Sequence, residues 1–263
     1  MTTSILVTGG TGTLGGHVLP LLTRTKTTVR VLTRHDREPD PRFDHVRGDL
    51  ADGSGLESAR EGVDVVLHLA GGPKGDDVAT QNLMRAASAA HVEKVVYISV
   101  IGADRVPIGW FESKFRAETA IVESGIPWTI LRAAQFHDLV LKTVTTLAKL
   151  PVMPNPGGLR FQPVDSRDVA ERLVELTFAD PARLVPDMAG PQVYTVAELG
   201  RSYLGALGKR RPIVPVRIPG KAGRAYRAGA NLSTEEITVG SRTWEAFLGE
   251  RYRQGSALVH RTP

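Results

Sequence analysis

The feature that most constrains the fold of this chain is a series of short, continuous apolar runs separated by longer amphipathic stretches. The runs are rich in β-branched residues and cover residues 5–8, 29–33, 43–46, 65–69, 95–99 and 128–132. Helical patterns lie between them, at residues 13–24, 77–91 and 112–124. Strands of this kind are buried on both faces, and right-handed crossovers join them into a parallel sheet. The sequence therefore predicts an α/β fold with a doubly wound, Rossmann-like parallel sheet.

The pattern changes after Gln135. A helix is expected at residues 138–150, and residues 151–158 are so rich in Pro and Gly that we expect an irregular loop. A short strand at 161–164 and further helices are expected beyond it, at residues 167–178, 196–207, 220–228 and 242–248. We therefore expect residues 1–150 to form the sheet domain. Residues 151–263 would form a smaller, mostly helical lobe, packed on the sheet domain as one structural unit.

A glycine-rich turn follows the first predicted strand and opens the first helix. Its glycines are Gly9, Gly12 and Gly15, and the residues between them include Thr11, Thr13 and Leu14. Such a turn lets the backbone approach a pyrophosphate, and the helix N-terminus then offers free N–H groups and a partial positive charge. A plain strand-to-helix turn is the alternative, but the further parallel strands favour a dinucleotide site.

The end of the second predicted strand selects between the two nicotinamide dinucleotides. An acidic residue there binds the adenosine ribose hydroxyls, whereas an arginine accommodates the 2′-phosphate of NADP(H). This chain has Thr33 and Arg34 at the strand end, with Arg37 one turn away. Asp36 argues for NAD(H) unless it pairs with Arg34 or Arg37. The alternative for the two arginines is that they are solvated surface residues without a role in cofactor binding. We expect NADP(H).

These motifs resemble those of the atypical short-chain dehydrogenase/reductases. The resemblance rests on residues 8–15 and 33–34, on Gly48-Asp49-Leu50, and on Leu69-Ala70-Gly71-Gly72. Later segments resemble the NmrA-like branch, which includes NADPH-dependent quinone reductases and redox-sensing regulators. These segments are residues 97–103, Ser113-Lys114 with Glu118, residues 128–132 with Phe136, and residues 164–170. The match runs from residue 5 to about residue 250.

The resemblance implies a place for several residues around the cofactor. Asp49 and Leu50 would border the adenine, and Ala70, Gly71 and Gly72 would pass beneath the cofactor. Lys114 would reach the nicotinamide ribose, with Phe136 beside the nicotinamide.

One departure from the wider superfamily bears on catalysis. That superfamily uses Tyr-x-x-x-Lys, in which the tyrosine protonates a carbonyl oxygen. Here Lys114 is present, but Trp110 stands at the tyrosine position, and an indole N–H is no usable acid at neutral pH. An acceptor whose reduced anion is stable, such as a quinone, needs no such acid. Lys114 is then the main catalytic candidate, as a positive charge near that anion.

Ser99 and His137 are the other candidates to contact substrate. The alternative for Ser99 is a hydrogen bond to local backbone, and the alternative for His137 is a structural or surface role. We therefore predict an NADPH-dependent oxidoreductase acting on a quinone-like or other electrophilic small molecule. A non-catalytic NADP(H)-sensing regulator is the alternative, and a sugar-nucleotide epimerase or dehydratase is a weaker one because it needs the missing acid.

The charge of the chain is unevenly distributed. The net charge is +5, yet eight Lys and Arg and no acidic residue lie between Leu199 and Thr234, which leaves −3 on the rest. Nucleic acid is a possible partner for such a segment, but its prolines and scarce aromatics favour a solvated face, with a partner interface or an anionic substrate as further alternatives. The segment from Arg201 to Arg227 therefore has no assigned role.

Several classes of protein are excluded or disfavoured by composition. The chain has no cysteine, so disulfides and thiolate metal sites are excluded. His68, His45 and Asp49 match no metal-ligand spacing, and we expect no metal. No apolar run is long enough to span a membrane, and the N-terminus does not resemble a secretion signal. We expect a cytoplasmic monomer or homodimer with no membrane partner.

Overall fold

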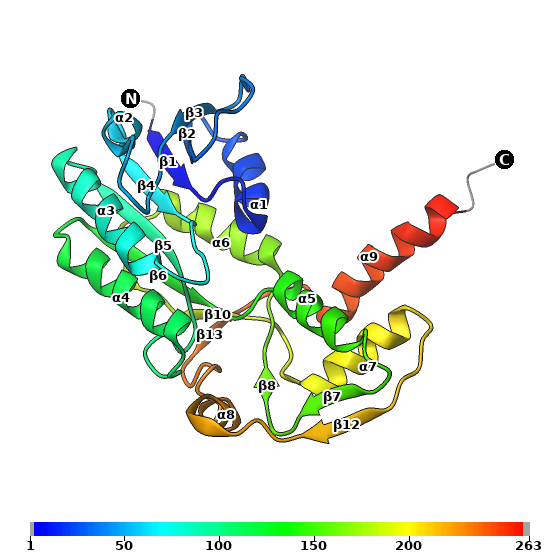
Figure 1. Ribbon diagram of the computed structural model, residues 1–263. Helices are drawn as coiled ribbons and strands as arrows, with labels where there is room; N and C mark the ends of the chain where they lie inside the picture. Colours follow the sequence, from blue (N-terminus) through cyan, green and yellow to red (C-terminus); the bar gives the residue numbers. More distant parts are fainter. Residues whose placement is uncertain (1–2, 260–263) are drawn as a thin grey trace.

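The computed structural model describes residues 3–259, with side chains to residue 252. Its centre is a parallel sheet in the order β13-β10-β6-β5-β4-β1-β2-β3, with β9 also paired to β6 (Figure 1). The strands of the first half are β1 Ser4–Thr8, β2 Thr28–Thr33, β3 Asp44–Arg47, β4 Val65–His68, β5 Lys94–Val100 and β6 Trp128–Ala133. The predicted doubly wound α/β fold is confirmed, and each of these strands lies within two residues of its predicted bounds.

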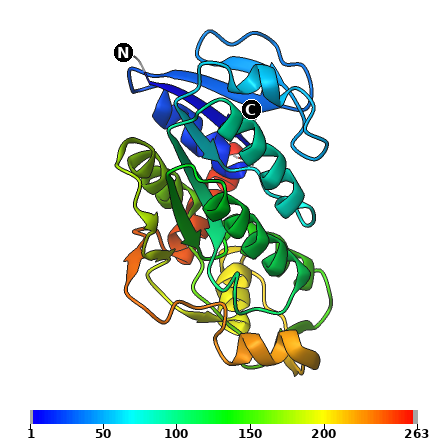
Figure 2. The ribbon, with the colours of Figure 1, turned by 90° about the vertical axis from the view of Figure 1, so that its left-hand side faces the viewer.

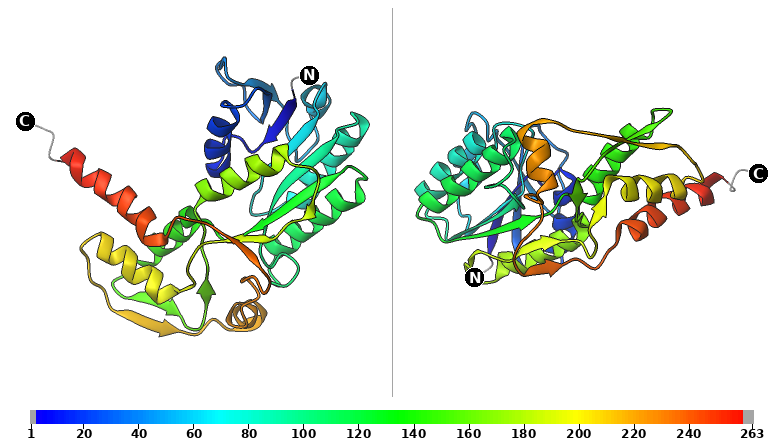
Figure 3. Two further views of the ribbon diagram at one scale, coloured as in Figure 1. Left: turned by 180° about the vertical axis from the view of Figure 1, so that it is seen from behind. Right: turned by 90° about the horizontal axis from the view of Figure 1, so that it is seen from below.

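Helices cover both faces of the sheet. On one face, α1 (Thr13–Leu22) packs against α6 (Ser166–Phe178), and Figure 3 (left) shows α6 lying across the sheet. On the other face, α3 (Asp76–Ala89) packs between the short α2 (Leu56–Arg60) and α4 (Gly109–Glu123), and Figure 2 shows α3 and α4 in front of the strands. Each face has its own apolar core, because side chains of a strand alternate between the two faces.

Segments beyond residue 150 return to the sheet. β9 (Arg183–Leu184) and β10 (Asp187–Ala189) both pair with β6, and β13 (Ile237–Val239) pairs with β10. Conversely, α5 (His137–Leu147) precedes residue 150 but packs on α7 (Val196–Ala206) in the lobe. The predicted boundary at residue 150 therefore does not separate sheet from lobe, since the chain crosses between them several times.

The lobe contains strands that the sequence analysis did not predict. β7 (Met153–Pro156) pairs in parallel with β12 (Ile213–Val216), so the segment expected to be an irregular loop is regular structure. Prolines are tolerated there because this two-stranded sheet consists of edge strands. Met153 is fully buried against Gly200 of α7, which leaves the other side of the two strands uncovered by α7.

The rest of the lobe is helical except for one short strand pair. β8 (Arg160–Phe161) pairs with β11 (Tyr194–Thr195), and α8 (Gly220–Arg227) follows β12. The last helix, α9 (Trp244–Val259), continues well beyond the predicted end at residue 248. Trp244 anchors it, because its fully buried ring belongs to the same core as α5 and α7.

Candidate functional site

The residues predicted to bind a dinucleotide meet at one edge of the sheet. Parallel strands place all their carboxyl ends on the same side, so the segments that follow β1, β2, β4, β5 and β6 become neighbours. These segments carry the glycine turn, the arginines after Thr33, residues 70–72, the end of β5 at Ser99, and Phe136. The site is therefore a product of the sheet's topology.

The glycine turn is packed so closely that side chains are excluded from it. Gly9 has a φ of +70°, and a Cβ placed on it would lie 2.6 Å from the backbone nitrogen of Ala70. A Cβ on Gly15 would lie 2.5 Å from the backbone of Gly10. The first glycine thus lets the turn contact the end of β4, and the third lets α1 contact the turn.

The N-terminus of α1 is free to bind an anion. Its N-cap residue is Gly12, and no side chain caps the first-turn N–H groups. Thr11, Gly12 and Thr13 are exposed, whereas Leu14 is buried in the core below. Uncapped amides at a helix N-terminus are the usual partners of a dinucleotide's phosphates, so the turn fits this group.

The end of β2 presents two free cations. Arg34 and Arg37 are exposed and make no side-chain hydrogen bond or ion pair with another residue in the described part of the chain. Asp36 instead pairs with Arg47 of β3, at 3.4 Å between Nη1 and Oδ2. The cationic partner of Asp36 is thus Arg47 rather than Arg34 or Arg37. Both arginines therefore remain available to a 2′-phosphate.

The segment after β3 is held by its own hydrogen bonds. Asp49 Oδ1 accepts a hydrogen bond from the Ala51 backbone N–H at 2.8 Å, and Asn82 of α3 donates to the Leu50 carbonyl at 2.8 Å. Both Asp49 and Leu50 are partly exposed. They form a fixed wall beside the arginines, where the resemblance implies the adenine.

Lys114 is buried in a network that sequence reasoning missed. Its Nζ lies 3.1 Å from Asp76 Oδ2 and 3.2 Å from the hydroxyl of Tyr97, directly beneath Gly71. Asp76 Oδ1 also accepts a hydrogen bond from the Gly72 N–H at 2.7 Å. Asp76 therefore joins the segment after β4 to the lysine of α4. Its position at the N-terminus of α3, where an acid is favoured, is the signal that could have identified it.

Ser99 also points into α4. Its Oγ donates a hydrogen bond to Glu118 Oε1, and Arg132 binds both oxygens of Glu118, at 2.9 and 2.7 Å. Arg132 further pairs with Asp104 in the loop after β5, at 3.2 Å. Ser99 is thus neither free to contact substrate nor bonded to local backbone. It belongs to a side-chain network that ties β5, β6 and α4 together.

The other polar groups below this site are buried and uncharged. His68 lies between Thr8 and Thr80, 2.7 and 3.0 Å from their hydroxyls, and stacks on Tyr97. Burial, and then the nearby Lys114 ammonium, lower the pKa of His68 to about 3. Burial, and then the carboxylates of Asp76 and Glu118, raise the pKa of Tyr97 well above its ordinary value. His68 and Tyr97 are therefore both neutral at pH 7 and fully or nearly inaccessible.

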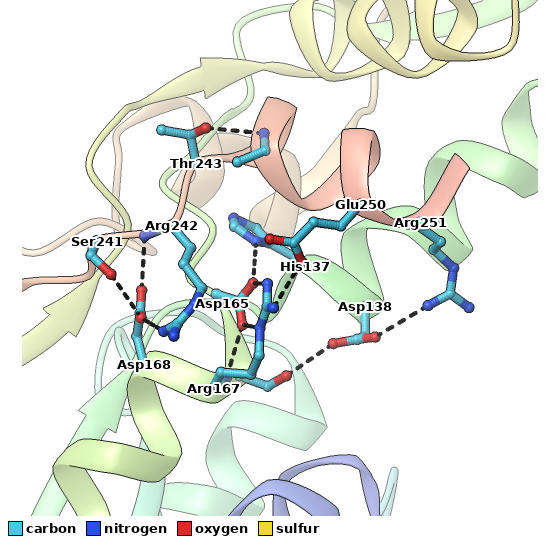
Figure 4. Close-up of polar contacts among 12 residues, drawn as sticks. His137, Asp138, Asp165, Arg167, Asp168, Ser241, Arg242, Thr243, Glu250 and Arg251 are labelled. Atoms are coloured by element: carbon cyan, nitrogen blue, oxygen red, sulfur yellow. Dashed lines mark hydrogen bonds and ion pairs between the residues drawn. The ribbon is translucent and has the colours of Figure 1, made fainter. Parts of the chain in front are cut away.

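His137 lies elsewhere than predicted. Its ring is fully buried, 5.7 Å from the ring of Trp244 and 5.2 Å from that of Phe247, and its Nδ1 lies 3.6 Å from Asp165 Oδ2. Figure 4 shows it inside the cluster in which Arg167 links Asp165 to Glu250. His137 therefore has the structural role given above as the alternative, and its side chain is not exposed to a substrate in this structure. Its backbone position at the start of α5 turns the side chain toward α9, where it packs.

The residue at the missing-tyrosine position faces an aromatic cluster. Trp110 packs edge-on against Phe111, with ring centroids 4.9 Å apart, and is partly exposed. Tyr226 of α8 reaches the same cluster from the lobe, 6.3 Å from Phe111 and 5.6 Å from Phe161. Phe136, at the other side of the edge, is partly buried. Sequence reasoning missed Tyr226, because only the fold brings α8 to the loop after β5.

In the part of the chain that is described, no three His, Asp or Glu side chains gather as metal ligands would. Among the same residues, no helix has the length and apolarity needed to cross a bilayer.

Comparison with known proteins agrees with this geometry. A family model described as NAD(P)H-binding matches residues 9–180. The chain is 30% identical over 226 residues to an NAD(P)H azoreductase of Xenophilus azovorans, covering 81% of this chain and 77% of that protein. It is 24% identical over 217 residues to quinone oxidoreductase 2 of Escherichia coli, covering 78% and 75%. The crystal structure of an NADPH-dependent quinone oxidoreductase from Escherichia coli, complexed with NADPH, superposes with a TM-score of 0.80 at 19% identity, covering 94% and 99% of the two chains.

Proposed function

Because the chain belongs to the NAD(P)H-binding family, we propose that it is an oxidoreductase that transfers hydride from NADPH to a quinone or another electrophilic acceptor. The names of its relatives support the class: one is an NAD(P)H azoreductase and another a quinone oxidoreductase. The acceptors named there are planar, conjugated and readily reduced. The absence of the catalytic tyrosine favours the same class of acceptor, because a quinone needs no acid to stabilise its reduced anion.

Groups that have no partner within the described part of the chain support a location for the cofactor. The uncapped amides of α1 and the turn from Gly9 to Gly15 would bind the pyrophosphate, and Arg34 with Arg37 would bind the 2′-phosphate. Asp49 and Leu50 would border the adenine, and residues 70–72 would lie beneath the cofactor. When bound there, NADPH supplies a hydride to the acceptor.

The main support for the proposal is that no activated proton donor replaces the missing tyrosine in the described part of the chain. Three described groups near the missing tyrosine could in principle replace it. Tyr97 and His68 are buried; the pKa of Tyr97 is raised, and that of His68 is too low for it to hold a proton at pH 7. Tyr226 is partly exposed, but its ring packs on Phe111 and Phe161 and burial raises its pKa, which makes it a weaker acid than a free phenol. A ketone reduced here would leave an alkoxide without an activated proton donor. A quinone becomes a delocalised hydroquinone anion, which takes its proton from water.

Lys114 contributes its charge rather than a proton. Its ammonium is held by Asp76 and Tyr97 beneath Gly71, so it sets a positive potential under the segment that would carry the nicotinamide. Asp76 neutralises part of that charge, which fixes the lysine in place.

Steady-state oxidation of NADPH with a panel of acceptors tests the proposal. Turnover is expected with benzoquinones, naphthoquinones or azo dyes, and none with simple ketones or secondary alcohols. A Trp110→Tyr variant serves as the comparison, because it restores the acid of the wider superfamily. Measurable NADPH binding without turnover of any acceptor would contradict the proposal.

A second candidate function is an NADP(H)-sensing regulator. The observation that favours it is Trp110, since a sensor needs the cofactor site but no acid. Pull-downs from a lysate with and without NADPH test it, and recovery of the same proteins in both would contradict it.

A further inference from the structure

One side of the β7–β12 sheet packs on α7 at Met153 and Ile213, and the other side is exposed at Val214 and Val216. Val214 and Val216 lie two residues apart, so they point to the same side of β12, and they are 46% and 45% exposed. Their partners across the parallel register are Pro154 and Pro156. Val152 and Ile218 extend this apolar strip at either end and are also exposed. We refer to residues 152–156, 214–218 and 220–224 as the lobe face.

The segments that form the lobe face carry charge of one sign. Residues 139–164 and 199–234 contain eleven Lys and Arg and no Asp or Glu. Several of these cations are exposed and make no side-chain hydrogen bond or ion pair with a described residue, namely Lys149, Arg210, Arg217, Lys221 and Arg224. Arg211 and Arg227 donate only to the backbone carbonyls of Leu150 and Ile218, which leaves their charge uncompensated.

The arrangement places these groups together at one edge of the molecule. Figure 1 shows β7, β12 and α8 along the edge of the lobe that lies farthest from β1–β3, and the view from behind in Figure 3 agrees. The segments that carry the apolar strip and the free cations of β12 and α8 therefore lie along the same edge.

Exposed aliphatic side chains accompanied by cations fit a negatively charged lipid bilayer. Anionic headgroups attract basic residues near the surface, and aliphatic side chains gain free energy by entering the boundary between headgroups and acyl chains. A nucleic acid would instead use aromatic rings for base stacking. The ring of Tyr226, the one aromatic residue from β12 through α8, is packed on Phe111 and Phe161.

We propose that the lobe face docks reversibly on anionic membranes, with Val214, Val216 and Ile218 entering the interface and Arg217, Lys221 and Arg224 binding lipid headgroups. The chain would lie on the membrane surface without crossing it, which departs from the sequence-based expectation of no membrane partner. This inference concerns binding alone, so it stands or falls separately from the proposed hydride transfer.

Co-sedimentation with vesicles tests the proposal on the full-length protein. The wild type should sediment with vesicles of phosphatidylcholine and phosphatidylglycerol and stay in solution with phosphatidylcholine alone. A double variant, Arg217→Gln with Lys221→Gln, should weaken binding about 25-fold, because each cation near the surface contributes about fivefold. Val214→Ser with Val216→Ser keeps every charge and should weaken binding at least about tenfold.

A matched control removes the same charge elsewhere. Arg24→Gln with Lys26→Gln alters two exposed cations after α1, at the opposite edge of the sheet, and should bind vesicles as the wild type does. Unchanged NADPH affinity shows that each variant is folded.

The proposal is overturned if the wild type fails to sediment with anionic vesicles at low salt. It is equally overturned if the valine variant binds like the wild type, or if the control loses as much binding as Arg217→Gln with Lys221→Gln. Tighter binding to single-stranded RNA than to vesicles, unaffected by the valine changes, would assign the surface to nucleic acid instead.

Discussion

The two ends of the candidate cofactor site differ in whether their charged side chains already have partners. At the end formed by β2 and β3, Arg34 and Arg37 are exposed and free of described partners. At the end formed by β4, β5 and α4, Lys114, Ser99 and their partners are buried in preformed ion pairs and hydrogen bonds. One end therefore has charges that are free of partners within the described part of the chain, whereas the other has charges held by buried partners. Preorganised charge of this kind is what stabilises a developing anion.

The largest effect is expected where the two ends meet, at the glycine turn. Gly15→Ala should lower the free energy of unfolding by about 3 kcal/mol or more and abolish NADPH binding, because the new Cβ would overlap the backbone of Gly10. Gly16→Ala, one residue further along α1, is the control, since a Cβ there meets nothing within 4 Å. It should stabilise the helix by up to about 1 kcal/mol. Urea unfolding and cofactor titration of both variants check this, and equal behaviour of the two would refute the packing argument.

The end formed by β4, β5 and α4 is tested by removing one charge from its buried pair. Asp76→Asn should lower the free energy of unfolding by about 3 kcal/mol, because Lys114 is then buried without its counter-ion. The double variant Asp76→Asn with Lys114→Met should recover much of that loss. Urea denaturation of the single and double variants measures the coupling. If the single variant is as stable as the wild type, the pair is not formed in solution, and this end is no more fixed than the other.

The same end should respond to acid through His68. Its pKa is about 3 in the folded protein, below the usual 6.5, so the unfolded state takes up a proton first as the pH falls. This group therefore costs no stability above pH 6.5 and destabilises the fold progressively between pH 6.5 and 3. The expected loss is about 2 kcal/mol by pH 5. His68→Asn should flatten that part of the stability–pH profile, and an unchanged slope in the variant would show that other groups cause it.

The smallest effect is expected at the end formed by β2 and β3. Arg34→Ala should weaken NADPH binding about tenfold and leave NADH binding unchanged, because only NADPH carries the 2′-phosphate. Arg47→Ala serves as the control, since Arg47 is exposed nearby but paired with Asp36. Calorimetric titration with both cofactors gives the comparison. An equal loss for NADPH and NADH in Arg34→Ala would mean that the arginine does not select the cofactor.

The sequence predicted the sheet better than it predicted the lobe. Central strands such as β1 and β5 are continuous apolar runs that can be stable only when buried on both faces, so their pattern is local and unambiguous. β7 and β12 lie on opposite sides of α7 in the sequence, and their strand structure depends on pairing with each other. Considered without their pairing partner, the prolines of β7 and β12 predict a loop.

For the candidate site, the sequence alone determined where the glycine turn and the arginines after Thr33 lie, because segments that follow parallel strands meet at the carboxyl ends of those strands. Only the tertiary structure decided what the remaining side chains do. Asp76 joins Lys114, Ser99 joins Glu118, and His137 turns away to pack against α9. These partners are distant in the sequence or unmarked by any motif, and a buried polar group takes whichever partner the fold brings within hydrogen-bond distance.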